Sequence, residues 1–145
     1  MENKVYFSGS FDILNIGHIE SFKILRRMAD NLDAELIVGV NTDELYNDYK
    51  GYKPILSFKE RFEIVSAIKY IDKVTPQPEF KTTNSLKKYK INYYVISEEW
   101  IKDKNEEREY MLNSGGMVAV LPYVKKGLSS SQIKNKIKEE WKIKK

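Results

Sequence analysis

The chain has 145 residues, of which 41% are hydrophobic and 32% charged, a composition typical of one globular domain. Cysteine is absent, which excludes disulfides and thiolate metal sites. No apolar run approaches the roughly 20 residues that a membrane span needs, and Met1 to Ser10 do not have the layout of a signal peptide. We therefore expect one cytoplasmic domain over residues 1–145, with no membrane partner.

The net charge of +4 invites a nucleic-acid hypothesis, which the type of basic residue disfavours. Only four of the 25 basic residues are arginine, whereas nucleic-acid binders favour the arginine fork and gather their charge on one face. The densest basic run, Lys134 to Lys145, is interrupted by Glu139 and Glu140. We expect a protein that handles small phosphorylated molecules and not a nucleic acid.

The first forty residues predict a strand, a helix and a second strand. Lys4–Ser8 is a short β-rich run that ends at a glycine. From His18 to Met28 the apolar residues recur at helical spacing. Leu36–Val40 is an unbroken apolar run, as expected of a strand that is covered on both faces.

A loop, a helix and a brief strand are predicted next. Asn47–Leu56 is polar and contains a glycine and a proline, so we expect a loop. Ser57, with Glu60 three residues later, forms a capping box that opens a helix running to about Ile71. Lys73–Thr75 is the expected strand.

The second half of the chain repeats the alternation. The helices expected there are Ser85–Tyr89, Glu106–Asn113 and Gln132–Lys142, and the strands are Tyr93–Ser97 and Met117–Leu121.

Strands that alternate with helices predict an α/β fold: a single Rossmann-like domain with a doubly wound parallel sheet. Ligands of such sheets bind outside the carboxyl ends of the strands, where the strand order reverses. The loops after Ser8, Val40, Ser97 and Leu121 are therefore the places to look for a site.

The loop after the first strand carries the strongest functional signal. It runs from Gly9 to His18 and reads GSFDILNIGH. Gly9 lets a ligand approach the backbone, and Gly17 precedes the helix at whose N-terminus His18, the only histidine, stands. Helix N-termini favour phosphate, and an imidazole there can donate to a phosphate oxygen as charge develops.

A second candidate phosphate site precedes the last predicted helix. Ser129, Ser130 and Ser131 follow Gly127 and offer hydroxyl and backbone N–H groups at a helix N-terminus. Three serines exceed what an N-cap requires.

These segments resemble, in order, the signature of the nucleotidyltransferases with an HxGH motif. Within them, the sequence is similar to the small cytidylyltransferases of the glycerol-3-phosphate type, and the resemblance covers nearly the whole chain. The matching segments are Gly9–His18, Asn41–Glu44, Lys50–Gly51, Glu60–Arg61, Tyr70–Val74, Glu98–Trp100 and Gly127–Ser131.

The resemblance implies transfer of CMP from CTP to a phosphorylated polyol or alcohol, with glycerol 3-phosphate the best single guess. The reaction is an in-line attack on the α-phosphate without a covalent enzyme intermediate, and the protein supplies positioning and charge neutralisation. It also implies Mg²⁺ or another divalent cation that is bound mainly through the nucleotide phosphates, no metal site of the protein's own, and a homodimer.

The resemblance also implies roles for individual residues. The catalytic group is expected to comprise His18, Asn15 and Lys50, and the acceptor phosphate is expected to contact Lys50, Arg61 and Lys69. The nucleotide-binding set is Gly9, Ser10, Phe11, Asp12, Gly17, His18, Glu99, Trp100, Ser129, Ser130 and Ser131.

Three positions depart from the family pattern. Asn15 replaces the first motif histidine and can donate a hydrogen bond but cannot carry a positive charge. Losing a charged donor at the reacting phosphate costs about 2–4 kcal/mol. The arginine expected before the last helix is missing, with Lys125 and Lys126 nearby, and Lys69 stands where arginine is common. An adenylyltransferase of the same superfamily and a nucleotide-binding protein without catalysis therefore stay open as alternatives.

Overall fold

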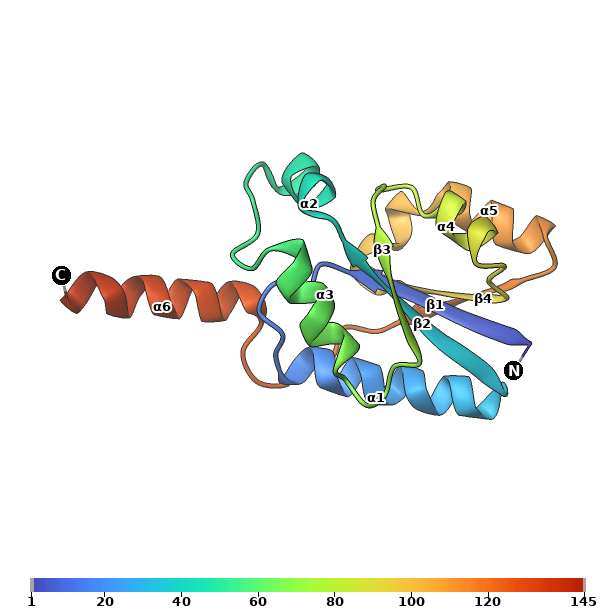
Figure 1. Ribbon diagram of the computed structural model, residues 1–145, viewed down its shortest axis with the longest axis horizontal. Coiled ribbons are helices and arrows are strands. Elements are labelled where there is room, and N and C mark those ends of the chain that lie inside the picture. The colour runs from blue at the N-terminus through green and yellow to red at the C-terminus, as the bar shows by residue number, and fades with distance from the viewer. Residues whose placement is uncertain (1, 145) are drawn as a thin grey trace.

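Five parallel strands form one sheet in the order β3-β2-β1-β4-β5 (Figure 1). The computed structural model describes residues 2–144, and side chains up to residue 142. The strands are β1 (Asn3–Gly9), β2 (Ala34–Asn41), β3 (Lys73–Gln77), β4 (Tyr93–Ser97) and β5 (Met117–Leu121). The helices are α1 (Ile16–Asn31), α2 (Asp43–Lys50), α3 (Phe58–Ser66), α4 (Thr83–Lys88), α5 (Asn105–Asn113) and α6 (Ser130–Lys144), with a 3-10 helix, η1 (Glu98–Asp103). The predicted doubly wound α/β fold is confirmed.

The prediction of a loop from residue 47 was wrong for its first residues, which belong to α2. Thr42 caps this helix by accepting a hydrogen bond from the N–H of Leu45, and Gly51 ends it with a φ of +80°. Only Leu45 and Tyr46 are buried, so the helix lacks the apolar stripe that would have revealed it.

The third helix ends five residues earlier than predicted. α3 stops at Ser66, and the chain then turns so that the N–H of Asp72 can donate to the carbonyl of Leu36. The Asp72 carboxylate accepts hydrogen bonds from the Leu36 N–H (2.7 Å) and from Arg26 (2.8 Å). Tertiary contacts with β2 therefore override the helix propensity of residues 67–71.

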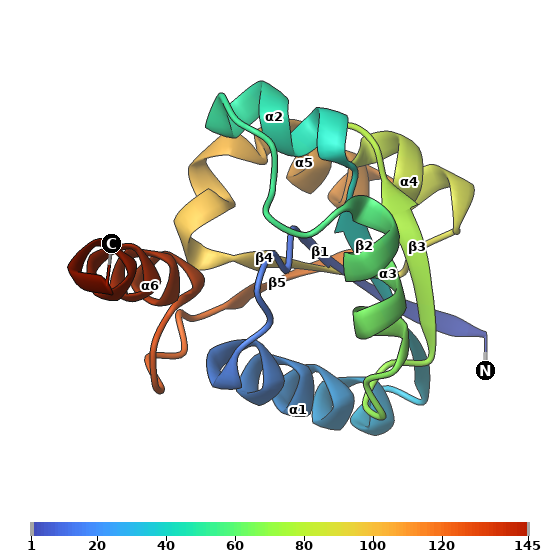
Figure 2. The same cartoon turned by 60° about the vertical axis from the view of Figure 1, so that its left-hand side comes forward.

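Alternation along the strands divides the core between the two faces of the sheet. The helices α1 and α3 cover one face of the sheet, and α4 and α5 cover the other (Figure 2). Val5 and Phe7 of β1 pack in the cluster on the first face, whereas Tyr6 packs in the cluster on the second. Both faces are buried, which explains the unbroken apolar strands.

The loop after β1 folds back on its own strand. Phe11, with a φ of +53°, packs against Phe7 and Phe22, and its ring lies over Gly9. A Cβ on residue 9 would lie 2.9 Å from that ring, so any larger residue there would force the Phe11 ring to shift.

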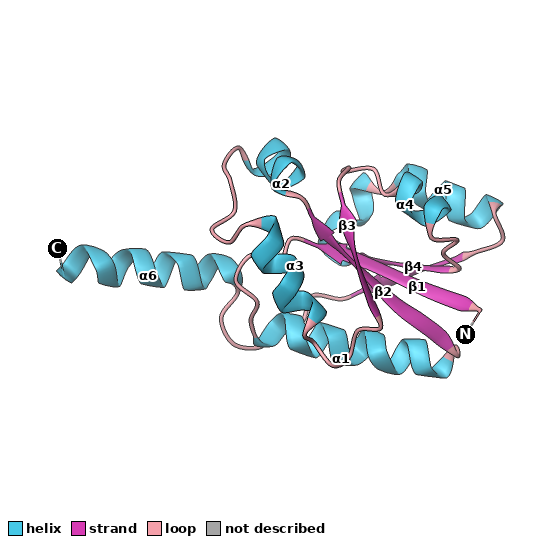
Figure 3. Ribbon diagram, in the orientation of Figure 1, coloured by secondary structure: helices cyan, strands magenta, loops and turns pink. Residues whose placement is uncertain are grey.

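α6 projects away from the body of the domain (Figures 1 and 3). Residues in its first turns contact the rest of the domain: Ser130 donates to the carbonyl of Ile13 (2.9 Å), and Lys134 donates to Asp12 (2.7 Å). The N-terminus of α6 is thereby fixed beside the N-terminus of α1.

Candidate active site

A cleft of about 390 Å³ opens at the carboxyl ends of the strands, where the strand order reverses between β1 and β4. The loops after β1, β2, β4 and β5, which the sequence singled out, all contribute to its lining. Its volume lies within the range of small-molecule sites.

The cleft brings together most of the residues expected from the sequence. They are Gly9, Ser10, Phe11, Asp12, Asn15, Gly17, His18, Lys50, Glu99, Trp100, Ser129, Ser130 and Ser131. Arg61 and Lys69 are not part of the lining.

His18 presents one defined ring nitrogen to the cleft. Its Nδ1 accepts a hydrogen bond from the backbone N–H of Asn15 at 3.1 Å. Because a backbone N–H can only donate, Nδ1 carries no proton in this arrangement, and the proton of the neutral ring is on Nε2. In this tautomer the Nε2–H of His18, which lines the cleft at the N-terminus of α1, is available as a hydrogen-bond donor.

Burial lowers the pKa of His18 below its usual value of 6.5. Both the pKa and the hydrogen bond to Nδ1 favour the neutral ring at pH 7.

Asn15 serves as the N-cap of α1 and as a bridge to α6. Its Oδ1 accepts from the N–H of Gly17 (3.0 Å), while its Nδ2 donates to the carbonyl of Ile13 (3.3 Å) and to Oγ of Ser130 (3.1 Å). With these contacts made, the side chain holds His18 and the two helix N-termini in place.

The three serines at the start of α6 have different surroundings. Ser129 is the N-cap and exchanges hydrogen bonds with Gln132 (2.9 and 3.2 Å). Ser130 lies between Asn15 and Ile13. Ser131 is exposed and lines the cleft beside the N-terminal N–H groups of the helix.

Asp12 fixes the loop between α2 and α3. Its carboxylate accepts from the N–H groups of Ile55 (2.9 Å) and Leu56 (3.0 Å) and from Lys134 (2.7 Å). Burial alone would raise the pKa of Asp12, but these three hydrogen bonds outweigh it and lower the pKa below 3.8. The carboxylate is thus an ionised link between the loop and α6.

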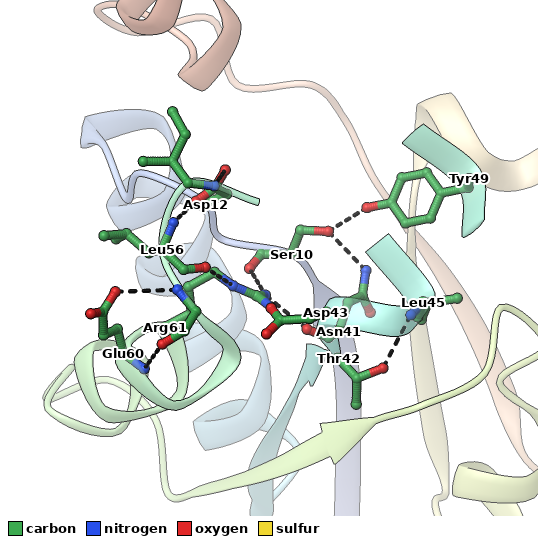
Figure 4. Close-up of polar contacts among 12 residues, drawn as sticks. Ser10, Asp12, Asn41, Thr42, Asp43, Leu45, Tyr49, Leu56, Glu60 and Arg61 are labelled. Atoms are coloured by element: carbon green, nitrogen blue, oxygen red, sulfur yellow. Dashed lines mark hydrogen bonds and ion pairs between the residues drawn. The ribbon is translucent and has the colours of Figure 1, made fainter. Parts of the chain in front are cut away.

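Arg61 is fully buried, and its guanidinium binds the protein itself (Figure 4). It donates to the carbonyls of Leu56 (3.0 Å), Ser10 (2.7 Å) and Asn41 (2.7 Å), and to the carboxylate of Asp43 (2.8 Å). The expected contact with an acceptor phosphate is therefore corrected: the arginine joins α3 to the ends of β1 and β2.

Lys69 lies between α3 and β3, exposed, with its Nζ 5.3 Å from the centroid of the Tyr70 ring. This segment leads into the amino end of β3, whereas the cleft lies at the carboxyl ends of the strands. The expected contact of Lys69 with the acceptor phosphate is therefore not supported within this chain.

Lys50 stands at the end of α2, beside a group of aromatic rings that line the cleft. We call Tyr49, Phe80 and Trp100 the aromatic wall. Their ring centroids are 5.9 to 6.5 Å apart, in edge-to-face and tilted contacts. The Nζ of Lys50 lies 5.9 Å from the centroid of Tyr49.

Several residues of the site escaped the sequence analysis. Lys134 had a usable signal, since it lies one helical turn after Ser130 and thus on the same face. Phe80 and Lys104 had none, because they meet across 24 residues through the hydrogen bond of Lys104 to the Phe80 carbonyl.

The described residues contain no group of three or more acidic, histidine or cysteine side chains arranged to hold a metal ion. None of the helices in residues 2–144 combines the length and the apolar character that a membrane crossing demands. The acidic side chains of the cleft include Asp12, already bound to Lys134, and Glu98, which accepts from the N–H of Tyr123 (3.1 Å).

This chain is similar to known proteins both in sequence and in fold. The model of a family described as Cytidylyltransferase-like matches residues 6–136. The chain is 30% identical over 110 residues to glycerol-3-phosphate cytidylyltransferase of Staphylococcus aureus, covering 71% of this chain and 80% of that protein. A lipopolysaccharide core biosynthesis protein from Thermoplasma volcanium has a similar fold, with a TM-score of 0.70 at 24% identity, covering 86% of this chain and 98% of that one.

Other relatives are much longer than this chain. It is 34% identical over 93 residues to a probable ethanolamine-phosphate cytidylyltransferase of Encephalitozoon cuniculi. The match covers 64% of this chain and only 28% of that protein.

Proposed function

Because this chain belongs to the cytidylyltransferase-like family, we propose that it transfers CMP from CTP to a small phosphorylated polyol or alcohol. The products are a CDP-alcohol and pyrophosphate. The observation that carries the proposal is the orientation of His18, whose Nε2 is free to donate while Asn15 binds Nδ1. This donor lies in a cleft that also contains the N-terminus of α6.

In this mechanism an oxygen of the acceptor's phosphate attacks the α-phosphorus of CTP. A new P–O bond forms, the bond to the bridging oxygen of the β-phosphate breaks, and pyrophosphate leaves with that oxygen. No side chain acts as the nucleophile. His18 donates to the α-phosphate as negative charge develops, and Lys50 neutralises phosphate charge.

The strand order suggests where the two substrates lie. Loops after β4 and β5 supply Glu99 and the neighbourhood of Tyr123, which suit the cytidine. Segments after β2 and β3 supply Lys50, Tyr49 and Phe80, which suit the acceptor. Trp100, which the resemblance assigned to the nucleotide, follows β4 in η1 and completes the aromatic wall from the other side of the sheet order. The triphosphate would then cross the N-termini of α1 and α6.

A divalent cation such as Mg²⁺ fits this site only as a companion of the nucleotide. The donor set of the cleft offers hydroxyls, lysines and N–H groups to phosphate, whereas its buried carboxylate, Asp12, is bound to Lys134. The cation would be held by the phosphates and would neutralise their charge. A homodimer and a cytoplasmic location stay predictions.

Pyrophosphate release tests the proposed function. The protein and Mg²⁺ are offered CTP or ATP, each with a panel of phosphorylated polyols and alcohols led by glycerol 3-phosphate. We expect release with CTP and at least one acceptor. Release with ATP alone would assign the chain to the adenylyl branch, and CTP binding without release from any pair would favour a nucleotide-binding protein without catalysis.

A further inference from the structure

Lys104 is a buried cation inside the cleft that the mechanism above does not use. Its side chain lies in the lining although the residue is only 8% exposed. Its Nζ donates to the carbonyl of Phe80 (2.5 Å) and to Oγ1 of Thr82 (3.2 Å). The same Nζ lies 4.3 Å from the centroid of the Phe80 ring, a close cation–π contact.

The charged form of Lys104 has support from nearby carboxylates. Glu107 accepts the N–H of Thr82 through Oε1 (3.0 Å), while its Oε2 is buried and has no hydrogen-bond partner in the described structure. Burial lowers the pKa of Lys104, and the charges of Glu107 and Asp103 oppose that shift.

Aromatic rings that line a cleft commonly bind quaternary ammonium groups, whose positive charge lies against the faces of the rings. In this cleft the chain's own lysines already lie at two of the three rings. Lys104 lies over Phe80 at 4.3 Å, and Lys50 lies near Tyr49 at 5.9 Å. A ligand cation at the aromatic wall would therefore meet two like charges.

Acidic side chains also line the cleft, and two of them already accept hydrogen bonds from the protein. Glu79 accepts a hydrogen bond from the amide of Asn84 (2.8 Å), and Glu98 binds the backbone at Tyr123, on the β5 side. Glu99, which the resemblance assigns to the nucleotide, also lines the cleft and directly precedes Trp100 in the chain.

We propose that Lys104 is a specificity-determining residue: it occupies the cation site of the aromatic wall and thereby excludes acceptors with a cationic alcohol, leaving neutral polyol phosphates. This inference rests on the proposed function, because it identifies the aromatic wall with the acceptor side of the cleft. Lys104 also holds Phe80 in place through the Phe80 carbonyl.

The test compares two acceptors of opposite character, glycerol 3-phosphate and phosphocholine, by kcat/KM for pyrophosphate release from CTP. Wild type should prefer glycerol 3-phosphate. Lys104→Met should raise the ratio of phosphocholine to glycerol 3-phosphate at least tenfold, since it removes the charge at similar volume. Lys104→Arg, which keeps the charge, should leave the ratio near that of wild type.

Lys87→Met is the matched control, because Lys87 lies 5.3 Å from the Tyr110 ring and is exposed outside the cleft. It should leave the ratio unchanged. If Lys104→Met does not fold by circular dichroism, the double variant Lys104→Met with Glu107→Gln replaces it. That variant removes both buried charges and keeps an acceptor for the Thr82 N–H.

A wild-type preference for phosphocholine, or an unchanged ratio in the charge-removing variant, would overturn the inference. If wild type releases no pyrophosphate with any acceptor, the proposed function fails separately, and calorimetric binding of phosphocholine decides the inference. The charge-removing variant should then bind phosphocholine at least tenfold more tightly than wild type, and equal binding would refute the role of Lys104.

Discussion

Asn15 fixes the tautomer and the position of His18. The backbone N–H of Asn15 selects the ring tautomer, and the Asn15 side chain caps the helix that carries the histidine. Asn15 stands where a charged histidine was expected. Its side chain carries no charge, so it contributes to the site by positioning His18.

The coupling of His18 to the fold predicts a pH dependence of stability. The folded state has a lower pKa for His18 than the unfolded value of 6.5, so below pH 6.5 the unfolded chain binds more protons. The contribution of His18 to the free energy of unfolding is therefore complete above this pH and is lost as the pH falls through the folded pKa.

Urea unfolding at about pH 7.5 and about pH 5 measures this effect. His18 is the only histidine, and Asp12, whose pKa is lowered from 3.8, stays ionised over this range. Wild type should lose more stability between the two pH values than His18→Gln, which cannot titrate. Equal losses in both proteins would show that His18 is not coupled to folding.

The sequence indicated most of the residues that line the cleft, but not the partners that their side chains bind. The glycines and the lone histidine after the first strand predicted a phosphate site. Arg61 binds backbone carbonyls and not a ligand, because α3 packs against the ends of two strands. No local sequence pattern encodes that packing.

At the scale of elements, Arg61 joins α3, the end of β1, the end of β2 and the start of α2. Four hydrogen bonds converge on one buried guanidinium, whose fork geometry a lysine cannot reproduce. Arg61→Lys should therefore lower the free energy of unfolding by about 2–4 kcal/mol, because buried acceptors lose their donors.

Urea unfolding checks this prediction, with Arg27→Lys as the control at an exposed position. The control should change stability by less than about 0.5 kcal/mol. A stable Arg61→Lys protein with a raised KM for the acceptor would contradict the structural role and restore the direct contact with the acceptor phosphate.

Strands with a continuous apolar run were predicted to within about two residues, whereas the helix α2 was not predicted. Tyr93–Ser97 and Met117–Leu121 have the predicted bounds. The interior strand β4 is apolar because it is buried on both faces, whereas β5 is an edge strand with Met117 and Val120 exposed, and its apolar run alone marked it. The short 3-10 helix η1 buries no residue, so it left no periodic signal.

At the scale of the whole molecule, the site is assembled from the two ends of the chain. Asn15 and Ser130 are 115 residues apart in sequence and 3.1 Å apart in space. Their contact sets the N-termini of α1 and α6 side by side, and we propose that the triphosphate of the nucleotide binds across both. The order of the strands predicted where this site lies, but not which side chains join it.

The central claim is that His18 stabilises the transferring α-phosphate in this cleft. Formation of the CDP-alcohol from CTP and the acceptor, followed by ³¹P NMR, tests it in wild type and in His18→Ala, with CTP affinity measured by calorimetry. We predict that His18→Ala lowers the rate at least about a hundredfold while CTP still binds. An unchanged rate of product formation in a folded His18→Ala protein would contradict the claim.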